Sequence, residues 1–131
     1  MGIVLMIHVL WRWAVVLVML VALVKFGLGW AQRKQPDLMD RRVTMLLTTV
    51  IDIQVLLGLI VLVWELMNGA LATPAIEHVI TMFIVVVVVH LTSIWRKREN
   101  NAVLRNNFLV AVVTLGLIVL GVSVVGGWSL G

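Results

Sequence analysis

The chain contains no cysteine, and only 12% of its residues are charged. The absence of cysteine excludes disulfides, thiolate-bound iron–sulfur clusters and the covalent attachment of c-type haem, so a redox cofactor would have to be held by histidine or methionine. The scarcity of charge excludes a water-soluble domain, because too few polar side chains remain to cover a surface, and the mean hydropathy is +1.16. The composition therefore indicates an integral membrane protein.

Long apolar runs occupy most of the 131 residues. Since a membrane-crossing helix needs ~20 residues, these runs predict four spans near residues 3–26, 44–66, 75–94 and 107–126. The third span holds a valine-rich run that would suggest a strand in water, but an unpaired strand cannot cross lipid. We therefore predict an all-α protein, a single transmembrane domain over residues 1–131 that folds as an up-and-down four-helix bundle. Small residues of the fourth span should lie at a helix contact: Gly116, Gly121, Ser123, Gly126 and Gly127.

The basic residues are concentrated in two connections. Nine of the ten lysines and arginines flank the first and third connections, whereas the second connection carries Glu65 and Glu77 and no base. The positive-inside rule therefore predicts cytoplasmic basic loops and both termini outside. This distribution explains the net charge of +4 without nucleic acid as a partner. No basic n-region or cleavage site precedes the first apolar run, so we expect this span to be retained.

Ionisable residues occur at the outer ends of the first and third spans. His8 and Arg12 are four residues apart and share one helix face. A charged side chain deep in lipid costs a few kcal/mol or more, so such residues usually face the bundle and mark a site. At 1.5 Å of rise per residue, His8 and His78 both lie roughly 5 to 6 Å inside the outer boundary, with Glu77 beside them. We call His8, Arg12, Glu77 and His78 the outer cluster.

The outer cluster supports two interpretations. Two histidines at matched depth on different helices can supply both axial ligands of haem b, with Arg12 on a propionate and Glu77 fixing or balancing an imidazole. Alternatively, His8, Arg12 and Glu77 form a structural ion-pair network near the headgroups, as polar clusters at helix ends often do, and His78 reaches toward water. Met82, one turn after His78, is an alternative iron ligand, although methionine on a helix more often fills a gap.

A second polar group lies toward the cytoplasmic side. Thr44, Thr48 and Asp52 follow at four-residue steps in the second span, and His90 ends the third. The stripe is either functional or structural, and in the structural interpretation the threonines bond to carbonyls of their own helix and a neighbour satisfies a protonated Asp52. In either case we expect Asp52 to point into the bundle. Asp52 lies about 13 Å and His90 about 7 Å from the cytoplasmic ends of their spans, which argues against direct contact, although Thr48 or a water could bridge them. A proton or small-solute carrier that uses this pair ranks lower, because no inverted repeat or broken helix is evident.

Four motifs together resemble a known family. They are H-x-x-x-R-W in the first span, an aspartate in the basic loop, Q-x-L-L-G-L at residues 54–59, and E-H-x-x-x-M at the start of the third span. The pattern covers nearly the whole chain and resembles short four-span bacterial membrane proteins labelled cytochrome-b-like. The resemblance implies a bacterial cytoplasmic-membrane protein with a haem-b- or quinone-linked electron-transfer role, carried by His8, Arg12, Glu77 and His78.

Two classes of function follow from these observations. The first is a small haem-b-binding electron-transfer subunit of a membrane redox complex. The second is a cofactor-free accessory subunit that fills a gap in a larger respiratory or photosynthetic assembly. Either function predicts lipid and other membrane subunits as partners, because almost no residues remain for an extramembrane domain. The sequence does not decide whether the protein is an enzyme.

Overall fold

The computed structural model describes residues 2–69, 72–98 and 102–126. Within these ranges the chain forms helices and no strand: α1 (Gly2–Ala31), α2 (Leu38–Met67), α3 (Thr73–His90), the single turn α4 (Thr92–Trp95) and α5 (Ala102–Val124). Four stretches, with α3 and α4 taken together as one of them, are long and apolar enough to cross a membrane. The predicted all-α four-helix architecture is confirmed, and the protein is a multi-pass membrane protein.

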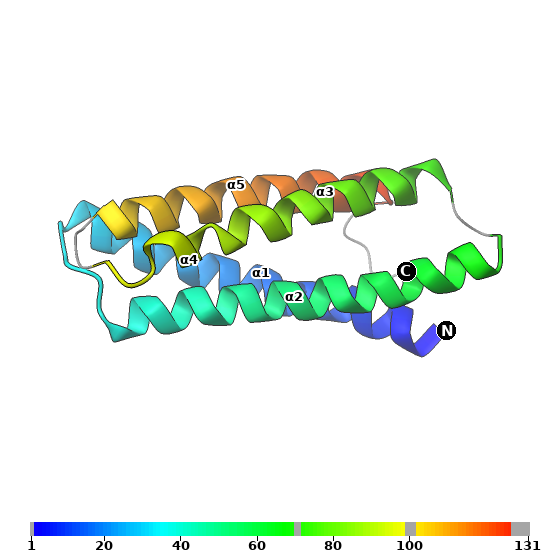
Figure 1. The fold of residues 1–131 in the computed structure, drawn as a ribbon, viewed down its shortest axis with the longest axis horizontal. Coiled ribbons are helices and arrows are strands. Elements are labelled where there is room, and N and C mark those ends of the chain that lie inside the picture. The colour runs from blue at the N-terminus through cyan, green and yellow to red at the C-terminus, as the bar shows by residue number, and fades with distance from the viewer. Residues whose placement is uncertain (1, 70–71, 99–101, 127–131) are drawn as a thin grey trace.

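The helices run up and down along one long axis (Figure 1). α1 packs against α2 and α5, and α3 packs against α5 and, more sparsely, against α2. The four spans therefore follow one another around the bundle in chain order. Because α1 and α3 occupy diagonal corners, side chains from these two helices can meet only across the centre of the bundle.

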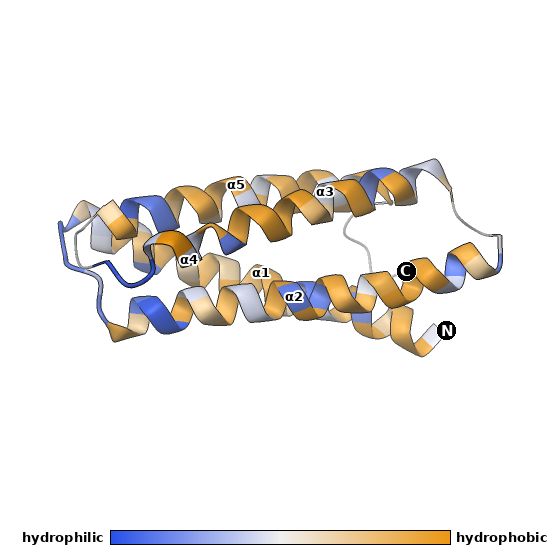
Figure 2. Cartoon of the chain, in the orientation of Figure 1, coloured by the Kyte–Doolittle hydropathy of each residue, from blue (hydrophilic) through white to orange (hydrophobic). Residues whose placement is uncertain are grey.

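The core of the bundle is narrow and its surface is apolar. Met19, Phe26, Leu47, Leu104 and Val89 are almost fully buried, whereas most other large apolar side chains face outward. Figure 2 shows that the helices are hydrophobic over most of their length and that hydrophilic residues gather at one end, around the α1–α2 connection and α4. A surface of this kind is stable in contact with lipid and not with water.

The connection between α1 and α2 is fixed by two aspartates and a lysine. The Asp37 carboxylate accepts a hydrogen bond from the Asp40 N–H, and the Asp40 carboxylate accepts one from the Asp37 N–H, both at 2.8 Å. This reciprocal capping box satisfies backbone donors that the start of α2 would otherwise leave free. The Lys25 ammonium of α1 lies 3.0 Å from Asp40 and 3.5 Å from Asp37, so the same carboxylates tie the two helices together.

The third span is interrupted, although the sequence predicts an unbroken helix to residue 94. α3 ends at His90 and α4 begins at Thr92, and the ribbon bends between them (Figure 1). The Leu91 N–H bonds to the Val88 carbonyl three residues earlier, at 3.1 Å. The hydroxyls of Thr92 and Ser93 bond back to the carbonyls of Val89 and His90 at 2.9 and 2.8 Å. Tightened turns and back-bonding hydroxyls both bend helices.

The small residues of α5 differ in what they contact. Gly121 lies against α3, where an added Cβ would collide with the Met82 methyl group and lie 3.2 Å from Thr81 Cγ2. The predicted helix contact is therefore confirmed at Gly121. It is wrong for Gly116 and Gly126, which face open space, and the Ser123 hydroxyl bonds to its own helix at Val119. Gly127 lies outside the described residues.

Candidate functional site

A cavity of about 780 Å³ lies between the helices at the end of the bundle where α1 begins. Side chains of α1, α2, α3 and α5 line it, and most of them are apolar. Its volume falls within the ~300–1,000 Å³ typical of cofactor and ligand sites. Among the described residues, five polar side chains lie in its wall: His8, Arg12, Gln54, Glu65 and His78.

The two histidine rings face each other across the centre of the bundle. The ring centroids of His8 and His78 are 6.4 Å apart, and the ring planes are inclined at 84°. The two residues come from α1 and α3, the diagonal corners. The depth counted along each span predicts that His8 and His78 lie at one level, and the structure shows that their rings also lie close together.

The His78 ring is held by the backbone of α5. Its Nδ1 lies 2.8 Å from the Gly121 carbonyl oxygen. Because a carbonyl can only accept, Nδ1 must carry a proton, and in the neutral ring Nε2 keeps its lone pair. A Cβ at Gly121 would collide with the Met82 methyl group, so the lack of a side chain there lets α5 approach α3 closely enough for this bond. Metal-binding histidines usually have this arrangement, with one nitrogen hydrogen-bonded and the other free.

The His8 ring lies against α2. A Cβ on Gly58 would be 3.1 Å from His8 Cε1, so the ring occupies space that only glycine leaves open. Gln54, one turn earlier on the same face of α2, donates a hydrogen bond from Nε2 to the His8 carbonyl at 2.8 Å. Two other polar atoms, His8 Nδ1 and Gln54 Oε1, are buried without a hydrogen-bond partner among the described residues. Such orphaned atoms cost about 1–3 kcal/mol each, which is typical of a site and not of a core.

Gln54 and Gly58 are functional candidates that the sequence analysis quotes only as part of a motif. The signal for their role is their spacing, because residues four apart on α2 share one face. The spacing does not reveal which helix this face of α2 packs against. The structure shows that Gln54 and Gly58 both contact His8 of α1.

Arg12 provides positive charge in the cavity wall. It lies one turn after His8 on α1, and its guanidinium carbon is 5.4 Å from the centre of the Trp13 ring. A guanidinium beside an apolar cavity can bind a carboxylate through two parallel hydrogen bonds. The wall can therefore orient an anionic group on a largely apolar ligand.

Glu77 is not brought to the cavity. Its side chain is exposed, and among the described residues it makes no ion pair with His8 or Arg12. Consecutive residues point about 100° apart on a helix, so Glu77 turns away when His78 faces the centre. The acidic residue of the cavity wall is instead Glu65 of α2, which the sequence analysis uses only for the charge of its loop.

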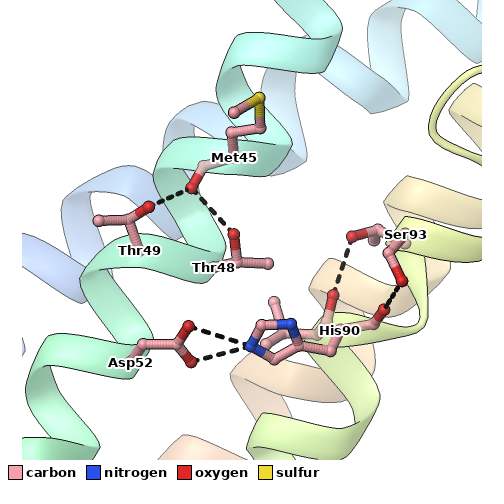
Figure 3. A network of polar contacts seen from close by, with 8 residues as sticks. Met45, Thr48, Thr49, Asp52, His90 and Ser93 are labelled. Carbon is pink, nitrogen blue, oxygen red and sulfur yellow. Dashed lines mark hydrogen bonds and ion pairs between the residues drawn. The ribbon is translucent and has the colours of Figure 1, made fainter.

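A second polar contact lies nearer the other end of the bundle. His90 Nε2 is 2.9 Å from Asp52 Oδ1 and 3.1 Å from Oδ2 (Figure 3). The expectation of no direct contact is wrong. It compared depths counted from assumed span ends at residues 44 and 94, and the observed contact shows that these two ends do not lie at one level. The expected inward orientation of Asp52 is also wrong, because both side chains are 47% exposed.

The hydroxyls of the α2 threonines agree with the structural interpretation of the stripe. Thr44 bonds to the Arg41 carbonyl at 2.7 Å, and Thr48 and Thr49 bond to the Met45 carbonyl at 2.9 and 2.7 Å. Their hydroxyls are thus satisfied within the helix. Asp52 and His90 remain as the ionisable pair on this part of the surface.

Comparison of the chain with family models, curated proteins and solved structures gave no match. The fold and the site together define a multi-pass four-helix membrane protein with a cavity between its helices that contains two facing histidines.

Proposed function

We propose that the protein is a small haem-b-binding electron-transfer subunit of the bacterial cytoplasmic membrane, with both termini on the outer side. The observation that carries this proposal is the facing pair His8 and His78 in the cavity. A bound haem b would supply one-electron redox chemistry. His8 and His78 would hold its iron, and the surrounding residues would hold and orient these rings.

The spacing of the two rings fits this role. Two iron–nitrogen bonds of about 2 Å, with about 1 Å from each nitrogen to the centre of its ring, place the ring centres roughly 6 Å apart. The observed centroid separation is 6.4 Å. Among the described residues no group of three or more histidine, cysteine or carboxylate side chains could hold a metal ion. Two imidazoles suit a metal that already carries its other ligands, as the iron of haem does in its porphyrin.

The hydrogen bonding of the His78 ring also fits. In the neutral ring, the bond from Nδ1 to the Gly121 carbonyl leaves the lone pair of Nε2 available for iron. The Gly121 carbonyl would thus take the fixing role that the haem interpretation assigns to Glu77. The space that Gly58 leaves for the His8 ring supports a ring that is positioned for a ligand and not for a packed core. Arg12 would pair with a propionate, and the apolar wall would exclude water.

The proposal requires redox partners. The four described spans offer one facing pair of histidines, so electrons must arrive from and leave to other molecules. We assign these roles to neighbouring membrane subunits and to a membrane quinone. The lipid-facing surface of the helices gives both direct access within the bilayer.

Absorption spectroscopy tests the proposal. We expect the protein purified from membranes supplied with haem to show a Soret band that shifts on reduction. His8→Ala and His78→Ala should each remove most of this band and leave the protein in the membrane, since insertion depends on the apolar spans. His90→Ala is the matched control and should keep the band. A wild-type protein without a Soret band, even after reconstitution with haem, contradicts the proposal.

The cofactor-free accessory subunit is the second candidate. The observation that favours it is the Asp52–His90 pair, which faces outward and so offers a polar contact to a neighbouring chain. This function replaces the first one if haem does not bind and the protein copurifies in fixed ratio with a larger membrane complex.

A further inference from the structure

The Asp52–His90 pair lies on an outward-facing, apolar part of the bundle. Each side chain is 47% exposed. Leu56 of α2 and Val87 of α3 stand one turn away on the same helix faces, and Ile94 follows in α4; these side chains are 59%, 63% and 63% exposed. Ionisable groups within a membrane normally turn toward the bundle interior. Here they are instead placed where a molecule dissolved in the bilayer can reach them.

The contact between the two side chains decides which atom is left for a ligand. The Nε2–H of His90 donates to both oxygens of the Asp52 carboxylate (Figure 3). In the neutral ring, a proton on Nε2 leaves Nδ1 as an acceptor, and no residue of the described part bonds to it.

The neighbouring hydroxyl groups do not compete for this acceptor. Ser93 donates to the His90 carbonyl, and Thr48 and Thr49 donate to the Met45 carbonyl (Figure 3). No other ionisable side chain of the described residues forms an ion pair with Asp52 or His90. The pair therefore presents one unoccupied acceptor beside an exposed carboxylate, within an apolar surround.

We propose that this pair binds the head group of a membrane-dissolved hydroquinone. The chemistry selects a neutral hydroxyl donor on an apolar body: the hydroxyl donates to His90 Nδ1, and the ring or tail packs on Leu56, Val87 and Ile94. Phospholipid phosphates are disfavoured, because Asp52 repels anions. Neutral lipid alcohols share the hydroxyl, but a phenolic hydroxyl is the stronger acid and the better donor to imidazole. The choice of a redox-active alcohol rests on the proposed function.

Nuclear magnetic resonance of the full chain in nanodiscs of neutral lipid tests this site. The chain has 3 histidines, so selective ¹⁵N labelling gives few and assignable imidazole signals. Titration with decylhydroquinone should shift the His90 signals saturably and leave those of His8 and His78 in place. Asp52→Asn should weaken binding at least about tenfold, because the amide no longer fixes the ring proton on Nε2. Glu77→Gln, which changes an exposed carboxylate at the other end of α3, is the matched control and should bind as the wild type does.

Each other outcome overturns the proposal. An unresponsive His90 in the wild type shows that the pair does not receive this ligand, and a normal affinity in Asp52→Asn with unchanged helical circular dichroism shows that the carboxylate is not part of the site. Equal binding of decanol or dioctanoylglycerol assigns the site to lipid alcohols. The titration needs no haem, so a protein that binds decylhydroquinone but shows no Soret band contradicts only the electron-transfer proposal.

Discussion

Each imidazole of the cavity depends on a glycine of another helix. Gly58 of α2 leaves the space that the His8 ring fills, and Gly121 of α5 brings its carbonyl to 2.8 Å from His78 Nδ1. These glycines have helical backbone angles, so their value lies in what a side chain would displace and not in conformational freedom. In each case a glycine, which has no functional side chain, sets the position of a histidine ring.

Substitution of Gly58 by alanine should therefore impair the site more than it impairs the fold. The new Cβ would lie 3.1 Å from His8 Cε1, so the ring must shift. The shift needed is only a few tenths of an ångström, so the cost in stability should lie at the low end of the about 1–3 kcal/mol that is typical of overpacking. We expect the Soret absorbance per protein to fall several-fold, while the thermal unfolding midpoint changes only modestly.

Gly116→Ala is the control for this substitution, because nothing lies within 4 Å of its added Cβ. It should keep both the absorbance and the unfolding midpoint, or raise the midpoint slightly through helix propensity. Equal losses of absorbance in the two variants would show that glycine content and not the His8 contact is responsible.

The connection between α1 and α2 should respond to acid. The hydrogen bond from the Asp40 N–H, aided by Lys25, lowers the pKa of Asp37 below its ordinary value of 3.8. Because the folded pKa lies below the unfolded one, the stabilisation is complete above the unfolded pKa and is lost as pH falls through the folded pKa. We expect amide hydrogen exchange in the first turn of α2 to accelerate as pH falls below about 4, after correction for the intrinsic rate.

Asp37→Asn separates capping from charge. Asparagine caps a helix nearly as well as aspartate does, but it does not titrate. Protection of the first turn should then lose the part of its acid dependence that comes from this residue. An unchanged acid profile in the variant would assign the effect to Asp40 or to another group.

Helix positions followed from the sequence, but helix ends and breaks did not. Hydropathy locates the apolar run, whereas α2 begins at Leu38 because the Asp37–Asp40 capping box starts it there. The interruption at Leu91 depends on two hydroxyls that bond backward, and hydropathy does not report such bonds. Depth placed His8 beside His78. The direction of each side chain around its helix took Glu77 away from the cavity, and depths counted from assumed span ends missed the contact of Asp52 with His90.

The distribution of basic residues predicts how the protein is oriented across the membrane, and cysteine labelling can test this orientation. Basic residues flank the α1–α2 and α4–α5 connections, so both should be cytoplasmic. The chain has no cysteine, which allows single-cysteine variants without background. Arg33→Cys and Lys97→Cys should react with an impermeant maleimide only after the membrane is opened, and Gly2→Cys should react in intact cells. Reaction of the first two in intact cells would reverse the topology.

The diagonal placement of the histidines has a consequence for biosynthesis. His8 and Gly58 belong to the α1–α2 hairpin, and His78 and Gly121 belong to the α3–α5 hairpin. Each hairpin thus carries one imidazole together with the glycine that positions it. The ribosome delivers the first hairpin, with its half of the cavity already formed, before the second has been made. A ligand that needs both imidazoles can be captured only when the second hairpin closes on the first.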